Sequence, residues 1–267
     1  MTARKYKLTS ATIVHKGRKL HRIQALRAFG NVQKFDLGGF IQNERNLKHS
    51  GDCWVDDKAK VYGNAVVRDN AIVYGGAIIS GQAIVRGNAT VGDHSMVTGS
   101  ATVSDFVMVS DSAVIKDSAA VSEKAEVCGN ARVADQAKVC GNAKICDNAT
   151  VEQGATVCDL ANVADQARIG GTAKICEQGA VFERATVFGH TIVSGEAIVH
   201  GDSKVVEGAV VKDNAEVTAN PLIKGYAQVG GGSVVETDIV IGGNTVLGVA
   251  QIEVFLEDIT PSEDFYF

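Results

Sequence analysis

The sequence predicts an all-β fold, a solenoid of short parallel strands, from three repeating features. Every sixth residue from Val55 to Leu247 is Val, Ile or Leu, and (247 − 55)/6 = 32 steps give 33 such positions without exception. A small residue, usually Ala, stands two positions before each of them, and Gly, Asp or Glu stands two positions after most of them. Because a helix repeats about every 3.6 residues and a half-buried strand about every 2, a strict period of six indicates a solenoid.

Each hexad is expected to form one short strand and one corner. The small residue and the aliphatic residue lie two apart, so both face the interior, and the residues beside the aliphatic one face outward. Gly63-Asn64 and Gly129-Asn130 exemplify the corner pairs, in which both residue types tolerate positive φ. Three hexads per coil give about eleven coils of 18 residues, and a strand spacing of about 4.8 Å gives a length of roughly 50 Å.

The hexads resemble the repeat of left-handed parallel β-helices, [LIV]-[GAED]-x-x-[STAV]-x, as in Val61-Tyr-Gly-Asn-Ala-Val and Val127-Cys-Gly-Asn-Ala-Arg. The resemblance implies a left-handed coil, whereas the general rule for parallel crossovers favours the right hand. The lead "GGFIQNERNLKHSGDCWVDDKAKVYG" is similar to that of YdcK-like hexapeptide-repeat proteins of bacteria and phages, and the similarity covers about residues 35–250. It implies the fold and no established activity. Phe40 and Trp54 are expected to be core aromatics of this lead.

Three regions are predicted, namely a capping segment at 1–50, the repeat at 51–250 and an aromatic, acidic capping tail at 251–267. Residues 1–50 hold 11 Lys and Arg against 2 Asp and Glu, a net of +9, and the remaining 15 basic and 29 acidic residues give −14. The cap is expected to begin with a β-hairpin that turns at Lys16-Gly17-Arg18. A cap would cover the backbone groups that the first coil leaves unpaired.

Composition favours a thin solenoid in the cytoplasm. The chain has 2 Pro and 6% aromatic residues, which suits an interior of Val and Ala. Neither a signal peptide nor a membrane span is expected, and 6 Cys without a secretory signal favour a reducing compartment. Nucleic acid is not expected as a partner, because few aromatic residues accompany the basic ones.

No catalytic, cofactor or metal residues are predicted. Acyltransferases that share this repeat place a His beside an extruded loop, and the repeat here contains no inserted residue. His94 and His190 fall at corners and His200 faces outward, in three different columns of the 18-residue coil. A zinc site of three converging imidazoles, as in the γ-class carbonic anhydrases, is therefore not expected.

Two outward features are candidate sites. Apolar residues precede the aliphatic position in the first third of the repeat, and three of them, 18 residues apart, should form one exposed stripe that favours a homo-oligomer, most simply a trimer or dimer. The apolar residues are Ile78, Met96 and Val114 in the stripe, with Val66, Ile72, Ile84 and Met108 beside it. Five Cys follow the aliphatic position and should form two ladders, Cys128 with Cys146, and Cys140 with Cys158 and Cys176.

These features together predict a non-catalytic scaffold that binds or assembles proteins and carries no cofactor. Two alternatives stay open. One is an acyltransferase-like enzyme with its site between protomers. The other is an inhibitor or DNA mimic whose acidic corners imitate a phosphate backbone.

Overall fold

The computed structural model describes residues 4–248 together with the backbone of Thr260 and Pro261. Two compact units, residues 1–135 and 136–267, are each described by themselves. Most of the predicted C-terminal capping tail, 251–267, lies outside the described residues. No helix that could span a bilayer occurs in the described part of the chain.

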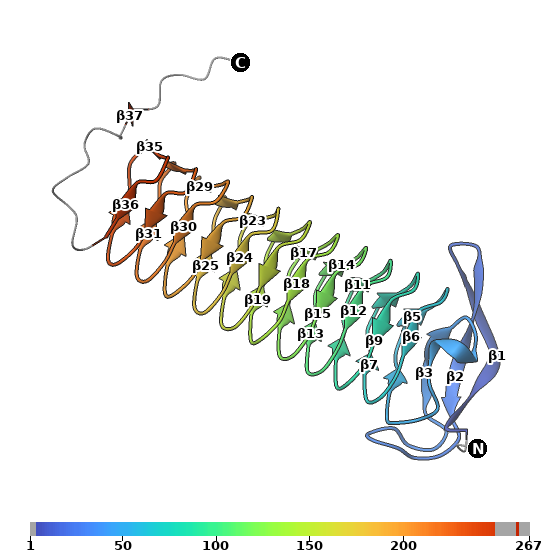
Figure 1. The fold of residues 1–267 in the computed structure, drawn as a ribbon. Coiled ribbons are helices and arrows are strands. Elements are labelled where there is room, and N and C mark those ends of the chain that lie inside the picture. The colour runs from blue at the N-terminus through green and yellow to red at the C-terminus, as the bar shows by residue number, and fades with distance from the viewer. Residues whose placement is uncertain (1–3, 249–259, 262–267) are drawn as a thin grey trace. The chain divides into compact units, whose positions relative to one another are not determined.

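The first unit is a parallel β-solenoid with three faces (Figure 1). The hairpin face contains β1 (Tyr6–His15), β2 (Arg18–Ala25), β3 (Leu37–Ile41), β5 (Lys60–Val61), β8 (Ile78–Ile79), β11 (Met96–Val97), β14 (Val114–Ile115) and β17 (Arg132–Val133). The tryptophan face contains β4 (Trp54–Val55), β7 (Ile72–Val73), β10 (Thr90–Val91), β13 (Met108–Val109) and β16 (Glu126–Val127). The third face contains β6 (Val66–Val67), β9 (Ile84–Val85), β12 (Thr102–Val103) and β15 (Ala120–Val121).

The capping segment is an antiparallel hairpin joined to the solenoid. Strands β1 and β2 pair across Lys16 and Gly17, whose φ values of 46° and 72° fit a tight turn between twisted strands, as predicted. Strand β3 then pairs in parallel with β5, with Ile41 opposite Val61. A 3-10 helix, η1 (Glu44–Asn46), follows, so parallel stacking already begins within the predicted cap.

The second unit is also a three-faced parallel solenoid. The cysteine face contains β18 (Lys138–Val139), β21 (Thr156–Val157), β24 (Lys174–Ile175), β27 (Ile192–Val193), β30 (Val210–Val211), β33 (Gln228–Val229) and β36 (Val246–Leu247). Another face contains β19 (Lys144–Ile145), β22 (Asn162–Val163), β25 (Ala180–Val181), β28 (Ile198–Val199), β31 (Glu216–Val217) and β34 (Val234–Val235). The last contains β20 (Thr150–Val151), β23 (Arg168–Ile169), β26 (Thr186–Val187), β29 (Lys204–Val205), β32 (Leu222–Ile223), β35 (Ile239–Ile241) and the antiparallel β37 (Thr260–Pro261).

The repeat produces these coils through its interior positions. Strands stack with residues 18 apart opposite each other, as Met96 lies opposite Ile78 and Ile192 opposite Lys174. Nearly all aliphatic and Ala positions of the repeat are fully buried, whereas most outward residues are half-buried or exposed. The predicted fold class, a left-handed parallel β-solenoid of 18-residue coils with a hairpin at its N-terminus, is confirmed.

Acidic corner residues have a structural role within each unit. Asp69 and Asp213, for example, have φ of 62° and 60°, a region that favours Gly. Their carboxylates accept hydrogen bonds from the backbone N–H of the corner one coil later, Gly87 at 3.2 Å and Gly231 at 3.0 Å. The hydrogen bond between coils offsets the backbone strain, which explains why Asp and Glu alternate with Gly here.

Candidate functional site

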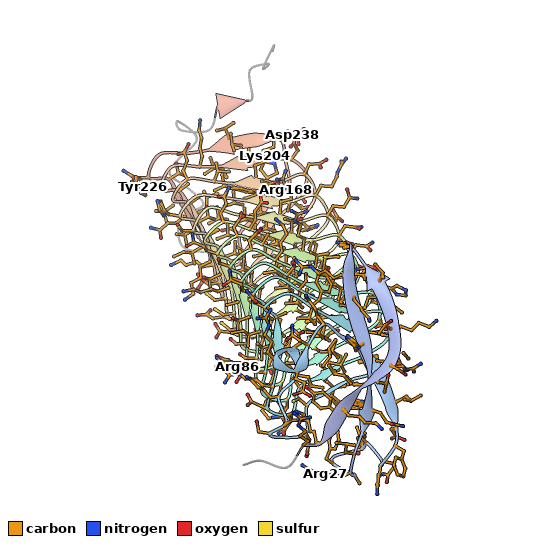
Figure 2. All side chains as sticks on the ribbon, turned by 90° about the vertical axis from the view of Figure 1, so that its right-hand side faces the viewer. Arg27, Arg86, Arg168, Lys204, Tyr226 and Asp238 are labelled. Atoms are coloured by element: carbon orange, nitrogen blue, oxygen red, sulfur yellow. The ribbon has the colours of Figure 1, made fainter. Side chains whose placement is uncertain are left out.

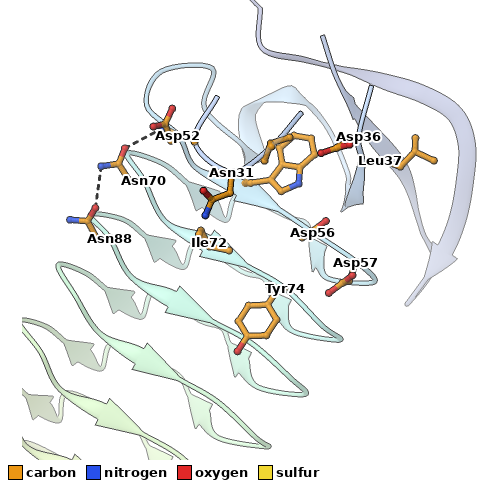
Figure 3. Close-up of a pocket in the computed structure, with 13 residues that line it drawn as sticks. Asn31, Asp36, Leu37, Asp52, Asp56, Asp57, Asn70, Ile72, Tyr74 and Asn88 are labelled. Carbon is orange, nitrogen blue, oxygen red and sulfur yellow. Dashed lines mark hydrogen bonds between the residues drawn. The ribbon is translucent and has the colours of Figure 1, made fainter. Parts of the chain in front are cut away.

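The main candidate site is a groove in the first unit, between the loop at 30–37 and the tryptophan face (Figure 3). Its volume is about 680 Å³. One side is the loop that connects β2 to β3, and the other side is the outer surface of β4 and β7 with their corners. The residues that line this acidic groove are Gly30, Asn31, Val32, Asp36, Leu37, Asp52, Trp54, Asp56, Asp57, Asn70, Ile72, Tyr74 and Asn88.

Two aromatic rings contribute to the groove. Trp54 is 4% exposed and packs edge-on against Phe29, with ring centroids 5.5 Å apart. Gly38 makes room for it, because a Cβ there would lie 2.5 Å from Trp54 Cζ2. The half-buried Tyr74 ring lies over Gly92, where a Cβ would approach Tyr74 Cζ to 2.1 Å. Small residues on the neighbouring strands thus hold both rings against the backbone.

The groove is acidic. Four Asp residues line it, and no Lys or Arg does. Asp36 accepts a hydrogen bond from Gln33 N–H at 2.7 Å, and Asp57 accepts one from Gly75 N–H at 3.3 Å. The half-buried Asp56 carboxylate has no hydrogen-bond partner among the described residues, so its acceptor capacity is available to a ligand.

Carboxamides form one edge of the groove. Asn70 Oδ1 accepts from the Asp52 N–H at 3.2 Å, and Asn70 Nδ2 donates to Asn88 Oδ1 at 3.1 Å, as drawn in Figure 3. This chain of hydrogen bonds fixes the orientation of the Asn70 amide. Asn88, whose carbonyl oxygen accepts this bond, ends the chain.

Beneath the groove, Lys5 is fully buried. Its Nζ donates to Gly51 O at 3.0 Å, Cys53 O at 2.8 Å and Cys53 Sγ at 3.2 Å, and it lies 4.9 Å from the centroid of the Phe29 ring. Burial lowers the pKa of Lys5 and raises the pKa of the Cys53 thiol, each partly offset by the other residue. Lys5 thus joins the hairpin to the loop that precedes β4.

The predicted oligomer residues occupy three faces of the first unit. Ile78, Met96 and Val114 are consecutive on the hairpin face and half-buried, between Lys60 and Arg132. The other four residues lie on the two other faces. Ile72 and Met108 lie on the tryptophan face, where Thr90 separates them. Val66 and Ile84 lie on the third face. The stripe is therefore continuous as expected, and its role in assembly stays a prediction.

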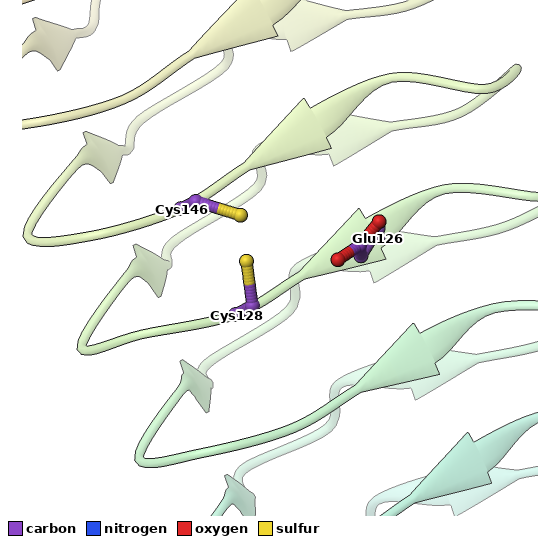
Figure 4. A group of neighbouring side chains, drawn as sticks. All are labelled: Glu126, Cys128 and Cys146. Carbon is purple, nitrogen blue, oxygen red and sulfur yellow. The ribbon is translucent and has the colours of Figure 1, made fainter.

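The cysteines follow their strands as predicted. In the second unit, Cys140, Cys158 and Cys176 directly follow β18, β21 and β24, which are consecutive rungs of the cysteine face. Cys158 and Cys176 are 9% and 5% exposed, so these outward positions are more buried than the repeat implies. In the first unit Cys128 directly follows β16, and in the second unit Cys146 directly follows β19 (Figure 4). Cys128 and Cys146 belong to different units, so the ladder predicted for them stays a prediction.

The three histidines considered from sequence have separate surroundings. His94 is exposed at a corner of the first unit. His190 Nδ1 lies 2.6 Å from Thr172 Oγ1, and His200 Nε2 lies 3.0 Å from Glu216 Oε1, both in the second unit. A shallow hollow of about 250 Å³ beside His190 is lined by Glu207 and Tyr226, and Tyr226 projects into solvent (Figure 2).

Sequence reasoning missed the acidic groove. The sequence predicts that Trp54 is a core residue, and the structure shows a buried ring that also lines the groove. One signal was available, since Asp52, Asn70 and Asn88 are 18 residues apart and so had to align. The fold of the loop at 30–37 had no such signal, because it lies outside the repeat.

Comparison with known proteins supports the repeat. The family model of the YdcK β-solenoid repeat matches residues 143–159, which confirms the predicted resemblance for that part of the chain. No match was found among curated proteins. The solved structure of the Arabidopsis UDP-N-acetylglucosamine acyltransferase is 16% identical over 67% of this chain and 70% of that chain, with a TM-score of 0.22. A similarity at this level assigns no activity.

Proposed function

We propose that this protein is a non-catalytic binding scaffold whose acidic groove takes a basic, extended segment of a partner protein. The observation that carries the proposal is the lining of the groove, which combines four Asp side chains and two aromatic rings and contains no Lys or Arg. Carboxylates attract Lys and Arg side chains, and the half-buried Tyr74 ring can bind the same cations on its face.

The geometry supports a polypeptide ligand in particular. Asn31 and Asn88 lie along the groove and offer carboxamide groups suited to the N–H and C=O groups of an extended backbone. The exposed Leu37 and Ile72, at 49% and 39%, supply apolar contact beside the charges. A segment in which basic and apolar residues alternate would match both.

The acyltransferase-like alternative makes a different prediction. It requires coenzyme A or an acyl-carrier thioester to bind between coils or protomers. If the chain bound coenzyme A with micromolar affinity, the scaffold proposal would be wrong and the acyltransferase-like alternative would be favoured. The DNA-mimic alternative is less favoured, because the corner carboxylates that it needs already accept hydrogen bonds from backbone N–H groups, as at Asp69 and Asp213.

Calorimetric titration tests the groove. We expect the full chain to bind a peptide of alternating Lys and Leu residues, and to bind a Glu/Leu peptide of the same length far more weakly. The double variant D36N/D56N should reduce affinity about tenfold, because each charged contact contributes about 0.5–1 kcal/mol at a partly exposed site. Affinity should also fall as salt rises.

The matched control is E196Q, which removes a carboxylate from the surface of the second unit. It should bind the basic peptide like the unaltered chain. A loss of affinity per removed charge that is as large in E196Q as in D36N/D56N would mean that only net charge matters, and would overturn the assignment of the groove. Equal affinity for the Lys/Leu and Glu/Leu peptides would overturn the proposal that the groove binds a basic segment.

We also propose that the hairpin-face stripe, Ile78, Met96 and Val114, forms a contact between copies of the chain. Three consecutive apolar rungs make a flat surface that a second copy can cover with the same residues. Sedimentation of an I78K/M96K variant tests this. A mass below that of the unaltered chain supports the proposal, and the same mass for both would refute it.

A further inference from the structure

The cysteine face of the second unit contains a row of thiols that the binding proposal does not use. None of Cys140, Cys158 and Cys176 is part of a disulfide bond. They follow Val139, Val157 and Ile175, which are paired in register on three consecutive strands. Backbone bonds fix the register, since Cys140 N–H donates to Val157 O and Cys158 N–H donates to Ile175 O, both at 3.0 Å.

Neighbouring thiols of the row interact. Cys158 is close enough to both Cys140 and Cys176 to interact with them electrostatically, and its Sγ donates to Asp159 Oδ2 at 3.5 Å. Cys158 and Cys176 are almost fully buried. The sulfur atoms of Cys158 and Cys176 thus lie at the ends of adjacent strands, at a site from which water is largely excluded. Cys140 occupies the equivalent position one strand before Cys158.

The spacing of a β-solenoid suits a linear metal–dithiolate. Adjacent strands lie about 4.8 Å apart. A metal–sulfur bond is about 2.3 Å long, so a linear sulfur–metal–sulfur unit spans about 4.6 Å. Thiolates select soft cations, of which Cu(I) is the physiological example. A cation bound between two rungs would leave the backbone register unchanged.

We propose that Cys140, Cys158 and Cys176 bind Cu(I) in two linear dithiolate sites, with Cys158 shared between them. Each site joins one rung to the next. Binding releases the thiol protons to solvent as the Cu–S bonds form, and no electron is transferred.

Charged side chains flank the row. Two Cu(I) ions with three thiolates carry a net charge of −1. Lys174 stands two residues before Cys176 on the same face, and Asp159 and Glu177 directly follow Cys158 and Cys176. The Lys174 ammonium group is therefore the cation that can offset the charge of the bound complex.

The row also has a defined end. On the next rung, β27, the equivalent position is Ser194, since Ile175 lies opposite Val193. A hydroxyl group is a poor ligand for Cu(I). The ladder of the second unit therefore provides two adjacent sulfur pairs and no third.

The experiment is a Cu(I) titration of the full chain against bicinchoninate, under reducing conditions and in a C128S/C146S background. In that background the remaining cysteines are Cys140, Cys158, Cys176 and the buried Cys53. We expect two Cu(I) per chain. C140S and C176S should each retain one, because one adjacent pair survives. C158S should retain none, because the two remaining sulfur atoms stand two rungs apart.

A gain-of-site variant covers the case in which a Ser substitution disturbs folding. S194C extends the row by one rung and should raise the stoichiometry to three, while T156C, on the same face but before the aliphatic position, should leave it at two. Equal copper loss in C140S and C158S would overturn the shared site. Unchanged stoichiometry in C158S, or no gain in S194C, would overturn the ladder as the site.

Discussion

The two units acquire their candidate sites in opposite ways. In the first unit the acidic groove exists because the chain departs from the repeat, where the loop at 30–37 folds beside the tryptophan face. In the second unit the thiol row exists because the repeat is strict, and one residue type recurs at the same position on three rungs. A solenoid can thus build a site from an interruption or from its periodicity.

This difference has a physical cause. A residue on a regular coil contacts its equivalents 18 positions away, so regular coils produce rows of like groups at the strand spacing. In the groove, several different chemical groups converge because a segment outside the repeat lies against a face. The groove therefore mixes carboxylates, carboxamides and aromatic rings, whereas the row contains sulfur alone.

The largest expected effect comes from the interior of the regular unit. V199D places a carboxylate at a fully buried position, and I198D places one at the neighbouring position, which is 38% exposed. We expect V199D to lower the free energy of unfolding by more than about 4 kcal/mol, since nothing in the core can pair with the charge, and I198D by less than about 1 kcal/mol. Urea denaturation followed by circular dichroism measures both. Similar losses of unfolding free energy in both variants would mean that the buried aliphatic position of each hexad does not stabilise the fold.

The irregular end of the first unit depends on Lys5. K5M keeps the length of the side chain but leaves the carbonyls of Gly51 and Cys53 without their donor, and should cost about 2–4 kcal/mol. K7M, at an exposed position of β1 two residues further along the chain, is the control and should cost little. If K5M were as stable as K7M, the buried ammonium would not hold the hairpin to the β4 loop.

The buried Cys158 thiol should make the free energy of unfolding depend on pH in the alkaline range. Burial and the hydrogen bond with Asp159 raise the pKa of Cys158 from 9.0 to about 12. Between these values the unfolded chain loses the proton while the folded chain keeps it, so the free energy of unfolding falls as pH rises from 9 to 12. C158S should show a shallower fall over that range. Identical slopes for the two proteins would contradict the burial of this thiol.

The smallest effect concerns one corner. D213A loses the bond to Gly231 and keeps a strained φ, so it should cost about 1–2 kcal/mol. D213G loses the bond but relieves the strain, and D213N can keep the bond, so both should cost less. Thermal melting of the three variants ranks them. A D213A no less stable than D213G would show that the corner backbone is not strained.

The sequence determines most of the fold and little of the groove. The six-residue repeat of aliphatic residues predicts the strands, the three faces and the 18-residue register. Lys16-Gly17 predicts the hairpin turn. The row of Cys140, Cys158 and Cys176 could be predicted for the same reason, since its members are 18 apart. The burial of these thiols could not, because it depends on how neighbouring side chains cover an outward position.

The groove depends on contacts that the repeat does not encode. Lys5 and Trp54 meet through Phe29, which belongs to the loop region rather than to a hexad. Nothing in the spacing of these residues fixes the path of that loop. The hairpin, by contrast, was predictable because its turn is local.

The most direct test of the account uses Trp54, the only Trp in the chain and a residue that lines the groove. A basic peptide titrated into the full chain should give a saturable change in tryptophan emission that weakens with salt and is reduced about tenfold in apparent affinity by D36N/D56N. The acidic peptide should give none. An emission that does not respond while calorimetry detects binding would place the basic segment elsewhere and contradict the groove as the binding site.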